Sequence, residues 1–531
     1  MPSGQRLLVA FGRERAPVTV GLALFRRTDG NAPRVDEDDP GKRGLGYWVP
    51  CGIRWNNESV QAAWEAAVKL DAPQVLEGYF WLPGQLDRVS GRLRISEVAE
   101  CSLELMGAFG GENAKFRDET RDLSTIHGVV QGGSVTLYDC FYLNENVSFG
   151  GVAISKLHVA TVFRGATLPA EAQLRFSKLE AAVAGLDDWL QITGIDAGFE
   201  FDAAHKLQSA FIRYVPPPKI ELSLLGIHVS FEFFWTVPAG KIRNEAKITH
   251  QARLVVVPEV DATFDDLRQQ LGRLVNFFSF AADQTLEIDA LFAYTPLATM
   301  DVPGGEKPIC MPVFYESSRP DRRGEVERYS MLFSYPDVAD RLQDMLADWL
   351  AHHEALSPAF NLYFAVRAGR HTFLESRFLS IAQGLETLHD RTSSETLEPP
   401  EQFAERVSEI LTACPHPHRE WLEEQLAYAN KLSLRKRMQH LLKPFTRHFG
   451  NAKARKGLVD KMVDTRNYLT HYDPALAAHA AQRGDLLPLV SKLEALFQLH
   501  LLLLVGIDQS RIDALVASNR KLRWRLGAEP G

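Results

Sequence analysis

The sequence predicts an α+β protein of several domains, in which a β-rich N-terminal region, folded as a sandwich or barrel, precedes an all-α helical bundle. The chain of 531 residues is too long for a single hydrophobic core. Up to about Tyr315, short segments rich in Val, Leu, Phe and Tyr alternate with Gly, Asn and Asp, which is typical of antiparallel strands. Beyond Met331, apolar residues recur at helical spacing almost throughout.

A polar segment, residues 316–330, separates the two patterns and reads as a linker. We therefore expect a β-rich sensing or regulatory region at residues 1–325 and a helical domain at residues 326–531. The β-rich region could itself divide in two near residues 195–215.

Bulk composition indicates a soluble globular protein that is not a general nucleic-acid binder. Hydrophobic residues make up 45% of the chain and charged residues 24%, and the net charge is −8. The five cysteines are scattered without metal-site spacing or a disulfide framework, and the N-terminus has no secretory pattern, so we expect a cytoplasmic protein. We expect no metal and no cofactor.

The N-terminal elements follow from composition and alternation. Residues 1–45 hold short apolar runs and a loop at residues 28–44, and residues 48–64 could close with a short helix. The predicted strand segments share Val, Leu, Phe and Tyr content and turn residues at their ends: 75–84, 89–98, 101–111, 126–133, 134–143, 149–163, 219–237 and 251–260. Apolar residues on one face predict helices at residues 171–192 and 264–281.

The C-terminal region is predicted to be a set of packed helices. Helical spacing of apolar residues is found in seven segments: 336–356, 373–391, 401–414, 419–431, 432–445, 457–474 and 488–507. The most apolar run, residues 496–507, is shorter than the roughly 20 residues that span a bilayer. We therefore expect a buried helix there and no membrane partner.

A concentrated basic segment lies at residues 431–461. It contains ten Lys or Arg and one acid, Asp460, for a net charge of +9, so the rest of the chain carries −17. Such a segment would attract phosphate, although a solvated helix face is an equally good interpretation. The predicted phosphate contacts are Arg435, Lys436, Arg437, Lys443, Arg447, Lys453, Arg455 and Lys456.

The basic segment leads directly into Arg466, Asn467 and His471, near a helix end set by Pro474. Metal-free RNA cleavage needs a base for the 2′-hydroxyl and a cation beside the phosphate, which neutral His and Arg supply. Asn467 and His471 are four residues apart and share a helix face. We therefore predict Arg466 and His471 to be catalytic, with Asn467 beside them on the same helix. The alternative is a surface Arg with a capping or buried His.

Arg–His spacing alone is weak support, because four pairs in this chain have four to six residues between them. The other three are Arg121/His127, Arg243/His250 and Arg435/His440. Only the pair Arg466/His471 combines a predicted helix, an Asn directly after the Arg and a basic segment immediately before it.

The segment that contains Arg466, Asn467 and His471 resembles a motif of a known protein family. The segment RNYLTH, residues 466–471, resembles the R-N-x-x-x-H form of the motif of HEPN-domain ribonucleases. The predicted helices around residues 376–391 and 432–442 resemble the HEPN subtype of ApeA-like anti-phage proteins, and residues 76–84, 90–95, 126–130 and 135–140 resemble the β-rich domain fused to it.

The resemblance implies a homodimer, or a higher homo-oligomer, in which two motif helices form one composite RNA site. It implies metal-independent cleavage of RNA, with tRNA as one candidate, leaving 2′,3′-cyclic phosphate and 5′-hydroxyl ends and causing abortive infection. It also implies a phage-derived activator. Carried over by position, Arg466 and His471 would be catalytic, and Asn467 would orient His471 or touch the phosphate. Glu386 sits beside the apolar face of its helix, where an unpaired carboxylate is costly, so it either pairs with Arg466 and positions it or is simply exposed to solvent. Tyr472, next to His471, would stack on a base or pack.

Two other functional classes are compatible with the sequence. A non-catalytic protein could bind RNA or a partner through the basic segment while its β-rich region senses a ligand. A carbohydrate-active sandwich is weaker, because no carboxylate pair stands in a recognisable site.

Among metal candidates, Cys414, His416 and His418 lack a fourth ligand, and the adjacent His352 and His353 point to different sides of a helix.

Overall fold

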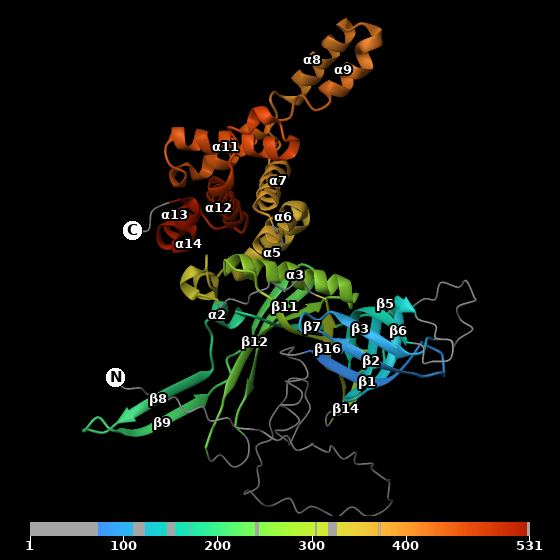
Figure 1. Ribbon diagram of the computed structural model, residues 1–531. Helices are drawn as coiled ribbons and strands as arrows, with labels where there is room; N and C mark the ends of the chain where they lie inside the picture. Colours follow the sequence, from blue (N-terminus) through green and yellow to red (C-terminus); the bar gives the residue numbers. More distant parts are fainter. Residues whose placement is uncertain are drawn as a thin grey trace, which may run out of the picture. The chain divides into compact units, whose positions relative to one another are not determined.

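The computed structural model describes residues 73–109, 123–145, 154–170, 173–238, 244–302, 305–316, 326–369, 371 and 373–527 (Figure 1). The loop and short helix expected before residue 65 lie outside these residues.

A six-stranded antiparallel barrel opens the described chain. Its strands are β1 (Gln74–Trp81), β2 (Val89–Ile95), β3 (Cys101–Met106), β4 (Thr125–Val130), β5 (Gly133–Glu145) and β6 (Ile154–Arg164). They pair in the order β6-β3-β2-β1-β4-β5, and the pairing of β5 with β6 closes the barrel. Alternate side chains fill its interior, as in β3, where Cys101, Leu103 and Leu105 are buried. The predicted strands and the barrel alternative are confirmed.

An open antiparallel sheet continues from the barrel, because β6 also pairs with β16. The sheet runs in the order β10-β11-β12-β7-β13-β16. Its strands are β7 (Lys178–Val183), β10 (Ile220–Leu224), β11 (Ile227–Thr236), β12 (Thr249–Pro258), β13 (Ile288–Tyr294) and β16 (Met311–Tyr315). Two small hairpins stand apart: β8 (Ile195–Phe201) with β9 (Leu207–Tyr214), and β14 (Thr299–Val302) with β15 (Gly305–Pro308).

The helix α3 (Phe264–Ala281) contacts β7 and β12 of this sheet, as its apolar face predicts. Its N-cap, Thr263, accepts a hydrogen bond from the backbone N–H of Asp266 at 3.1 Å. Trp189 and Phe278 contribute to the core between helix and sheet, with ring centroids 4.9 Å apart.

The helix predicted at residues 171–192 is wrong for most of its length. Residues Lys178–Val183 form β7, paired on one side with β12 and on the other with β13, and only Leu186–Leu190 is helical, as α2. A central strand with both faces covered buries successive residues, as β7 does from Leu179 to Val183, so its apolar residues do not alternate and can mimic helical spacing. Gly185, at φ +78°, separates the strand from the short helix.

The β8–β9 hairpin was not predicted, and it occupies the range where a subdivision of the β-rich region was expected. In the described chain its strands pair only with each other. Several of its apolar side chains are exposed: Phe199, Phe201, Leu207, Phe211 and Ile212. The domain boundaries stay predictions.

Beyond residue 335 the described chain is helical, as predicted. The α-helices are α4 (Tyr335–Val338), α5 (Leu342–Ala355), α6 (Ser357–Arg367), α7 (Leu374–Thr392), α8 (Pro400–Ala413), α9 (Arg419–Leu426), α10 (Leu434–Leu442), α11 (Ala452–His471), α12 (Leu486–Leu504), α13 (Gln509–Ser518) and α14 (Arg520–Leu526). The elements α6, α13 and α14 were not predicted individually. The hairpin of α8 and α9 has no buried residue in either helix, and Figure 1 shows the two side by side.

The helix α12 is long and apolar enough to cross a membrane by length and composition, but it is a core helix here. It buries 13 side chains, among them Glu494, whose carboxylate pairs with Arg377 and with Arg367 at 3.5 Å. The expected buried helix is confirmed.

A buried polar network links the segment after α3 to the helices. The carboxylate of Asp283 accepts hydrogen bonds from Arg525 at 2.7 Å, from Arg367 at 2.9 Å and from the amide of Gln498 at 2.6 Å. Beside it, Trp349 of α5 stacks on Phe280 and donates to the carbonyl of Arg273 at 2.8 Å. The β-rich region and the helices therefore share one continuous core.

Candidate nuclease site

The site is built on the C-terminal end of α11. Its N-cap, Asn451, accepts a hydrogen bond from the backbone N–H of Ala454 at 2.9 Å. The helix ends at His471, and Tyr472 takes the left-handed conformation at φ 52°, so the chain turns away before Pro474. This is the helix end that the proline predicts.

Thr465, which the sequence analysis missed, anchors this helix end. Its hydroxyl is fully buried, donates to the carbonyl of Lys461 at 2.6 Å and accepts from the backbone N–H of Ala481 at 2.7 Å. The chain after the helix is thereby tied back to α11, which fixes the position of the last two turns. No local signal distinguishes this Thr from an exposed one, because its partner lies 16 residues away.

Arg466 pairs with Glu386 of α7, as the sequence predicts, at 3.7 Å between Nη2 and Oε2. The other carboxylate oxygen of Glu386 lies 3.5 Å from Arg437 of α10, and Arg437 also lies 3.4 Å from Asp390. One carboxylate thus joins three helices at the motif. Arg466 and Glu386 remain about one-third exposed, so the guanidinium can still reach a phosphate in solution.

Asn467 and His471 complete the motif on the outer side of α11. The Nη1 of Arg466 donates to the amide oxygen of Asn467 at 3.4 Å. His471 is exposed, and no hydrogen bond or ion pair of the described residues engages its ring. Tyr472 is 68% exposed and meets Tyr468 edge to face at 5.8 Å, so its ring is open to a ligand. The structure therefore gathers Arg466, Asn467 and Glu386 in contact and leaves His471 accessible one turn away.

The predicted phosphate contacts fall into two groups. Among the described residues, three lysines are exposed and have no ion pair: Lys436, Lys443 and Lys453. The other five have intramolecular partners: Arg435 with Asp460 and Asp464, Arg437 with Glu386 and Asp390, Arg447 with Asp513, Lys456 with Asp460, and Arg455 with the carbonyls of Thr446 and Gly450.

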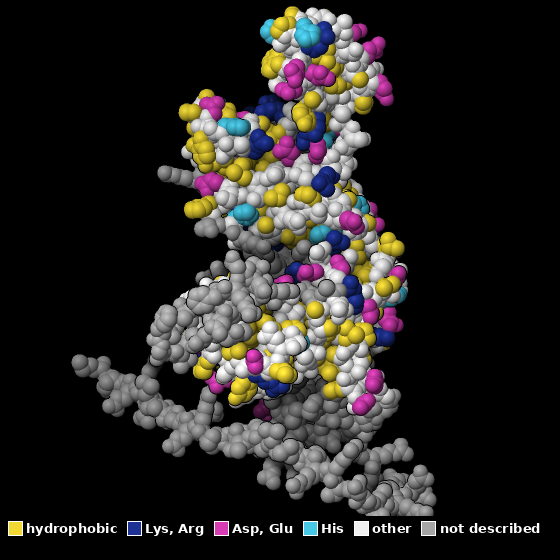
Figure 2. Space-filling model, turned by 90° about the vertical axis from the view of Figure 1, so that its right-hand side faces the viewer, with side chains coloured by type: hydrophobic (Ala, Val, Ile, Leu, Met, Phe, Trp, Pro, Cys, Tyr) yellow, Lys and Arg dark blue, Asp and Glu magenta, His cyan; other side chains and the backbone are white. Residues whose placement is uncertain are grey.

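This pairing reduces the net positive charge that the linear sequence suggests. On the face shown in Figure 2, dark blue Lys and Arg side chains over the helices are interspersed with magenta Asp and Glu side chains. Arg437 departs most from its predicted role, because its side chain is only 12% exposed and its charge is used between α7 and α10. It is better placed to hold Glu386 than to meet a phosphate.

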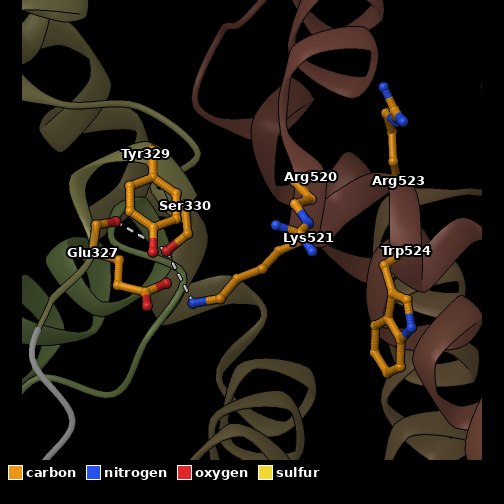
Figure 3. A pocket seen from close by; sticks show the side chains of 7 residues that line it. All are labelled: Glu327, Tyr329, Ser330, Arg520, Lys521, Arg523 and Trp524. Atoms are coloured by element: carbon orange, nitrogen blue, oxygen red, sulfur yellow. Dashed lines mark hydrogen bonds between the residues drawn. The ribbon is translucent and has the colours of Figure 1, made fainter. Parts of the chain in front are cut away.

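A separate pocket of about 390 Å³ lies where residues 327–330 meet α14. Figure 3 shows Lys521 reaching across to Ser330, where Nζ donates to the hydroxyl at 2.9 Å. Exposed Tyr329 and Trp524 lie on opposite sides of this pocket, and Arg520 belongs to its lining (Figure 3). None of the motif residues lines it, so it lies outside the candidate nuclease site.

Comparisons with known protein families agree with the fold. The family model of the ApeA N-terminal domain 1 matches residues 76–349, which include the barrel, the open sheet and α3. The model of the Apea-like HEPN domain matches residues 379–511, which include α10, α11 and most of α7. No curated protein and no solved structure gives a significant match. With a barrel-bearing N-terminal domain and a helical domain that each match an ApeA model, the chain belongs to the ApeA-like HEPN family.

Proposed function

We propose that this protein is an anti-phage defence ribonuclease that cleaves RNA at a composite site formed by two copies of the chain. HEPN domains typically work as dimers and bind RNA, and the family is associated with ribonucleases and antiviral defence. The observation that supports catalysis most directly is the arrangement at the end of α11. There Arg466, which pairs with the carboxylate of Glu386, lies beside Asn467, and His471 is exposed on the last helical turn.

In the proposed reaction, neutral His471 removes the proton from a ribose 2′-hydroxyl. The 2′-oxygen forms a bond to the adjacent phosphorus while the bond from phosphorus to the 5′-oxygen breaks. His471 of the second copy, in its protonated form, supplies the proton to the leaving 5′-oxygen. The products are a 2′,3′-cyclic phosphate and a 5′-hydroxyl, and no metal takes part.

Arg466 stabilises the negative charge that develops on the phosphate oxygens in the transition state. Asn467, in contact with the guanidinium, orients that group or touches the phosphate itself. Glu386 acts as a positioning residue through its ion pair with Arg466. Tyr472 offers an exposed ring on which a flanking base can stack.

The whole protein would act in the cytoplasm. Its β-rich region would sense a phage-derived cue or restrain the nuclease, and activation would degrade tRNA or other exposed single strands and stop translation in infected cells. The buried network around Asp283, which joins the segment after α3 to α6, α12 and α14, is a physical connection through which such a signal could pass.

The proposal is tested in cells by inducing the wild-type protein, Arg466→Ala and His471→Ala. We expect wild-type protein to slow growth or to reduce phage plating, and both variants to lose this effect while accumulating to the same level. The matched control is His479→Ala, an exposed histidine outside the motif, which should behave as wild type. Full activity of both motif variants would rule out the assignment.

A further inference from the structure

A cluster of two histidines and a glutamate lies next to the nuclease motif and plays no part in the proposed cleavage. His389 is in the last turns of α7, Glu395 follows that helix, and His440 is near the end of α10. One nitrogen of each ring and one carboxylate oxygen of Glu395 all lie within 4.8 Å of one another. The two ring centroids are 5.6 Å apart.

The ring of His389, one of the two histidines of the cluster, has an unsatisfied nitrogen. The side chain is only 5% exposed, and its Nε2 is buried without a hydrogen-bond partner in the described structure. Leaving a buried polar atom unpaired costs about 1–3 kcal/mol, so such an atom calls for a ligand. A buried imidazole nitrogen beside a second imidazole and a carboxylate is the donor set that a divalent transition metal satisfies.

We propose that His389, Glu395 and His440 form a binding site for a divalent transition metal, with Zn²⁺ as the ion that fits best. Two histidines and one carboxylate are a common set of protein ligands for Zn²⁺ that leaves a fourth position for water. Hard cations such as Mg²⁺ prefer all-oxygen sites, and no thiol is present to favour Cu⁺.

The ligands need only a small movement to close on an ion. Ligand bonds of about 2.0–2.1 Å place tetrahedral donor atoms roughly 3.3 Å apart, so the cluster must contract by up to about 1.5 Å. Glu395 is 61% exposed and lies outside the regular helix, so it can supply that movement, and its carboxylate already contacts Nδ1 of His440.

The charges around the cluster also permit a cation. Arg437, one turn before His440, is the nearest basic side chain on α10, but Glu386 and Asp390 already pair with it. The carboxylate of Glu395 therefore remains to compensate the charge of an ion.

An ion bound at this site would hold together the two chain segments from which the α8–α9 hairpin extends. The chain leaves α7, passes Glu395, and returns to α10 by way of a bridge between Thr396 and Lys431 and a hydrogen bond from Leu397 N to the Asn430 carbonyl at 2.9 Å. An ion at this place would join α7 to α10 one turn beyond the contact of Glu386 with Arg437. Zn²⁺ would therefore stabilise the helical domain, and this inference does not depend on the nuclease proposal.

The experiment uses full-length protein that has been stripped with a chelator and titrated with Zn²⁺, with bound metal counted by atomic emission. We expect one Zn²⁺ per chain, a rise in Tm on addition of the ion, and a tetrahedral visible spectrum when Co²⁺ replaces it. His440→Ala and Glu395→Gln should each weaken binding by at least about tenfold, the scale at which even outer-sphere partners matter. Both positions are partly exposed, so the variants should fold, as circular dichroism can verify.

His416→Ala is the matched control, because it removes a histidine from the other group of metal-binding residue types, Cys414, His416 and His418. It should bind Zn²⁺ as tightly as wild type. The proposal is overturned if wild-type protein retains no Zn²⁺. It is equally overturned if folded His440→Ala and Glu395→Gln bind the ion unchanged, or if His416→Ala is the variant that loses it.

Discussion

Glu386 is the residue whose contacts most directly constrain the motif arginine. An ion pair of two partly exposed groups at 3.7 Å contributes little to stability, at most about 1 kcal/mol. Its effect on geometry is larger, because a misplacement of about 1 Å at a reacting centre can cost on the order of 100-fold in rate. Glu386 therefore matters to the proposed chemistry more than to the fold.

We predict that Glu386→Gln lowers RNA cleavage by about 10- to 100-fold while changing the free energy of unfolding by less than about 1 kcal/mol. Single-turnover cleavage and urea unfolding measure the two quantities. Asp390→Asn is the control, because Asp390 contacts Arg437 and, in the described structure, not Arg466. Equal losses of activity in the two variants would show that Glu386 has no specific role at Arg466.

At the scale of single residues, the motif could be predicted from the sequence, but most of the residues that pack around it could not. Arg466, Asn467 and His471 could be predicted because a helix end, a proline and an unusual charge run lie within one stretch of chain. The pairing of Glu386 with Arg466 was one of two alternatives that followed from the place of Glu386 beside the apolar face of its helix. The roles of Thr465 and Arg437, and the meeting of His389 with His440, depend on helices packing together, which no local pattern encodes.

At the scale of the elements, the basic segment covers α10, the short connection after it and the first half of α11, and its lysines and arginines differ in availability. The arginines and Lys456 have intramolecular partners, whereas Lys436, Lys443 and Lys453 are exposed with no ion pair among the described residues. Among the eight predicted phosphate contacts, binding should therefore depend mainly on these three lysines.

We predict that changing Lys436, Lys443 and Lys453 together to Gln weakens RNA binding and flattens its salt dependence. Each lost contact to a single strand reduces the slope of log K against log salt by about 0.7, so the triple variant should lose up to roughly 2 units. Binding is measured by fluorescence anisotropy over a range of NaCl concentrations, in the His471→Ala background to prevent cleavage.

The matched control changes the same charge in the β-rich region, at Lys156, Lys206 and Lys247, which are exposed and have no ion pair among the described residues. That variant should keep the wild-type slope. If the two triple variants show the same slope, RNA does not contact the basic segment through these lysines.

The elements themselves were well predicted where one face meets solvent and poorly where both faces are covered. Buried positions recur at helical spacing in α3 and at every second residue in the barrel strands. The hydrophobic periodicity of the sequence therefore identified these elements. The strand β7 is buried on both faces and was mistaken for a helix. The β8–β9 hairpin was missed, and its strands carry few buried side chains.

At the scale of the whole molecule, the Asp283 network is the feature that ties the β-rich region to the helical domain. Its carboxylate is fully buried and is compensated by Arg367 and Arg525. Removing one member of a buried ion pair leaves an uncompensated charge and costs about 3–5 kcal/mol. The network is therefore a stability requirement and a physical connection between the two regions.

We predict that Asp283→Ala lowers the free energy of unfolding by about 3–5 kcal/mol, because Arg525 and Arg367 lose their shared partner. Urea denaturation monitored by tryptophan fluorescence measures the loss, and Trp349 in the adjoining core should report it. Asp340→Ala, at an exposed aspartate, should change stability by less than about 0.5 kcal/mol. A similar small loss for Asp283→Ala would show that the buried pairs are not needed for the fold.

The order of a β-rich region followed by helices could be predicted from sequence, but their connection could not. Asp283 and Arg525 are 242 positions apart, and Arg525 lies on α14, a helix that the sequence pattern did not separate from its surroundings. Contacts at such separation depend on the complete packing of the chain.

The central claim is that Arg466 and His471 are half of a ribonuclease site completed by a second copy of the chain. It is tested most directly by incubating purified protein with a labelled RNA and determining the end groups of the products. The wild-type protein and His479→Ala are predicted to leave 2′,3′-cyclic phosphate and 5′-hydroxyl ends in the presence of chelator, whereas folded Arg466→Ala and His471→Ala should leave the RNA intact. Cleavage by either motif variant at the wild-type rate, or products with 5′-phosphate ends, would contradict the account.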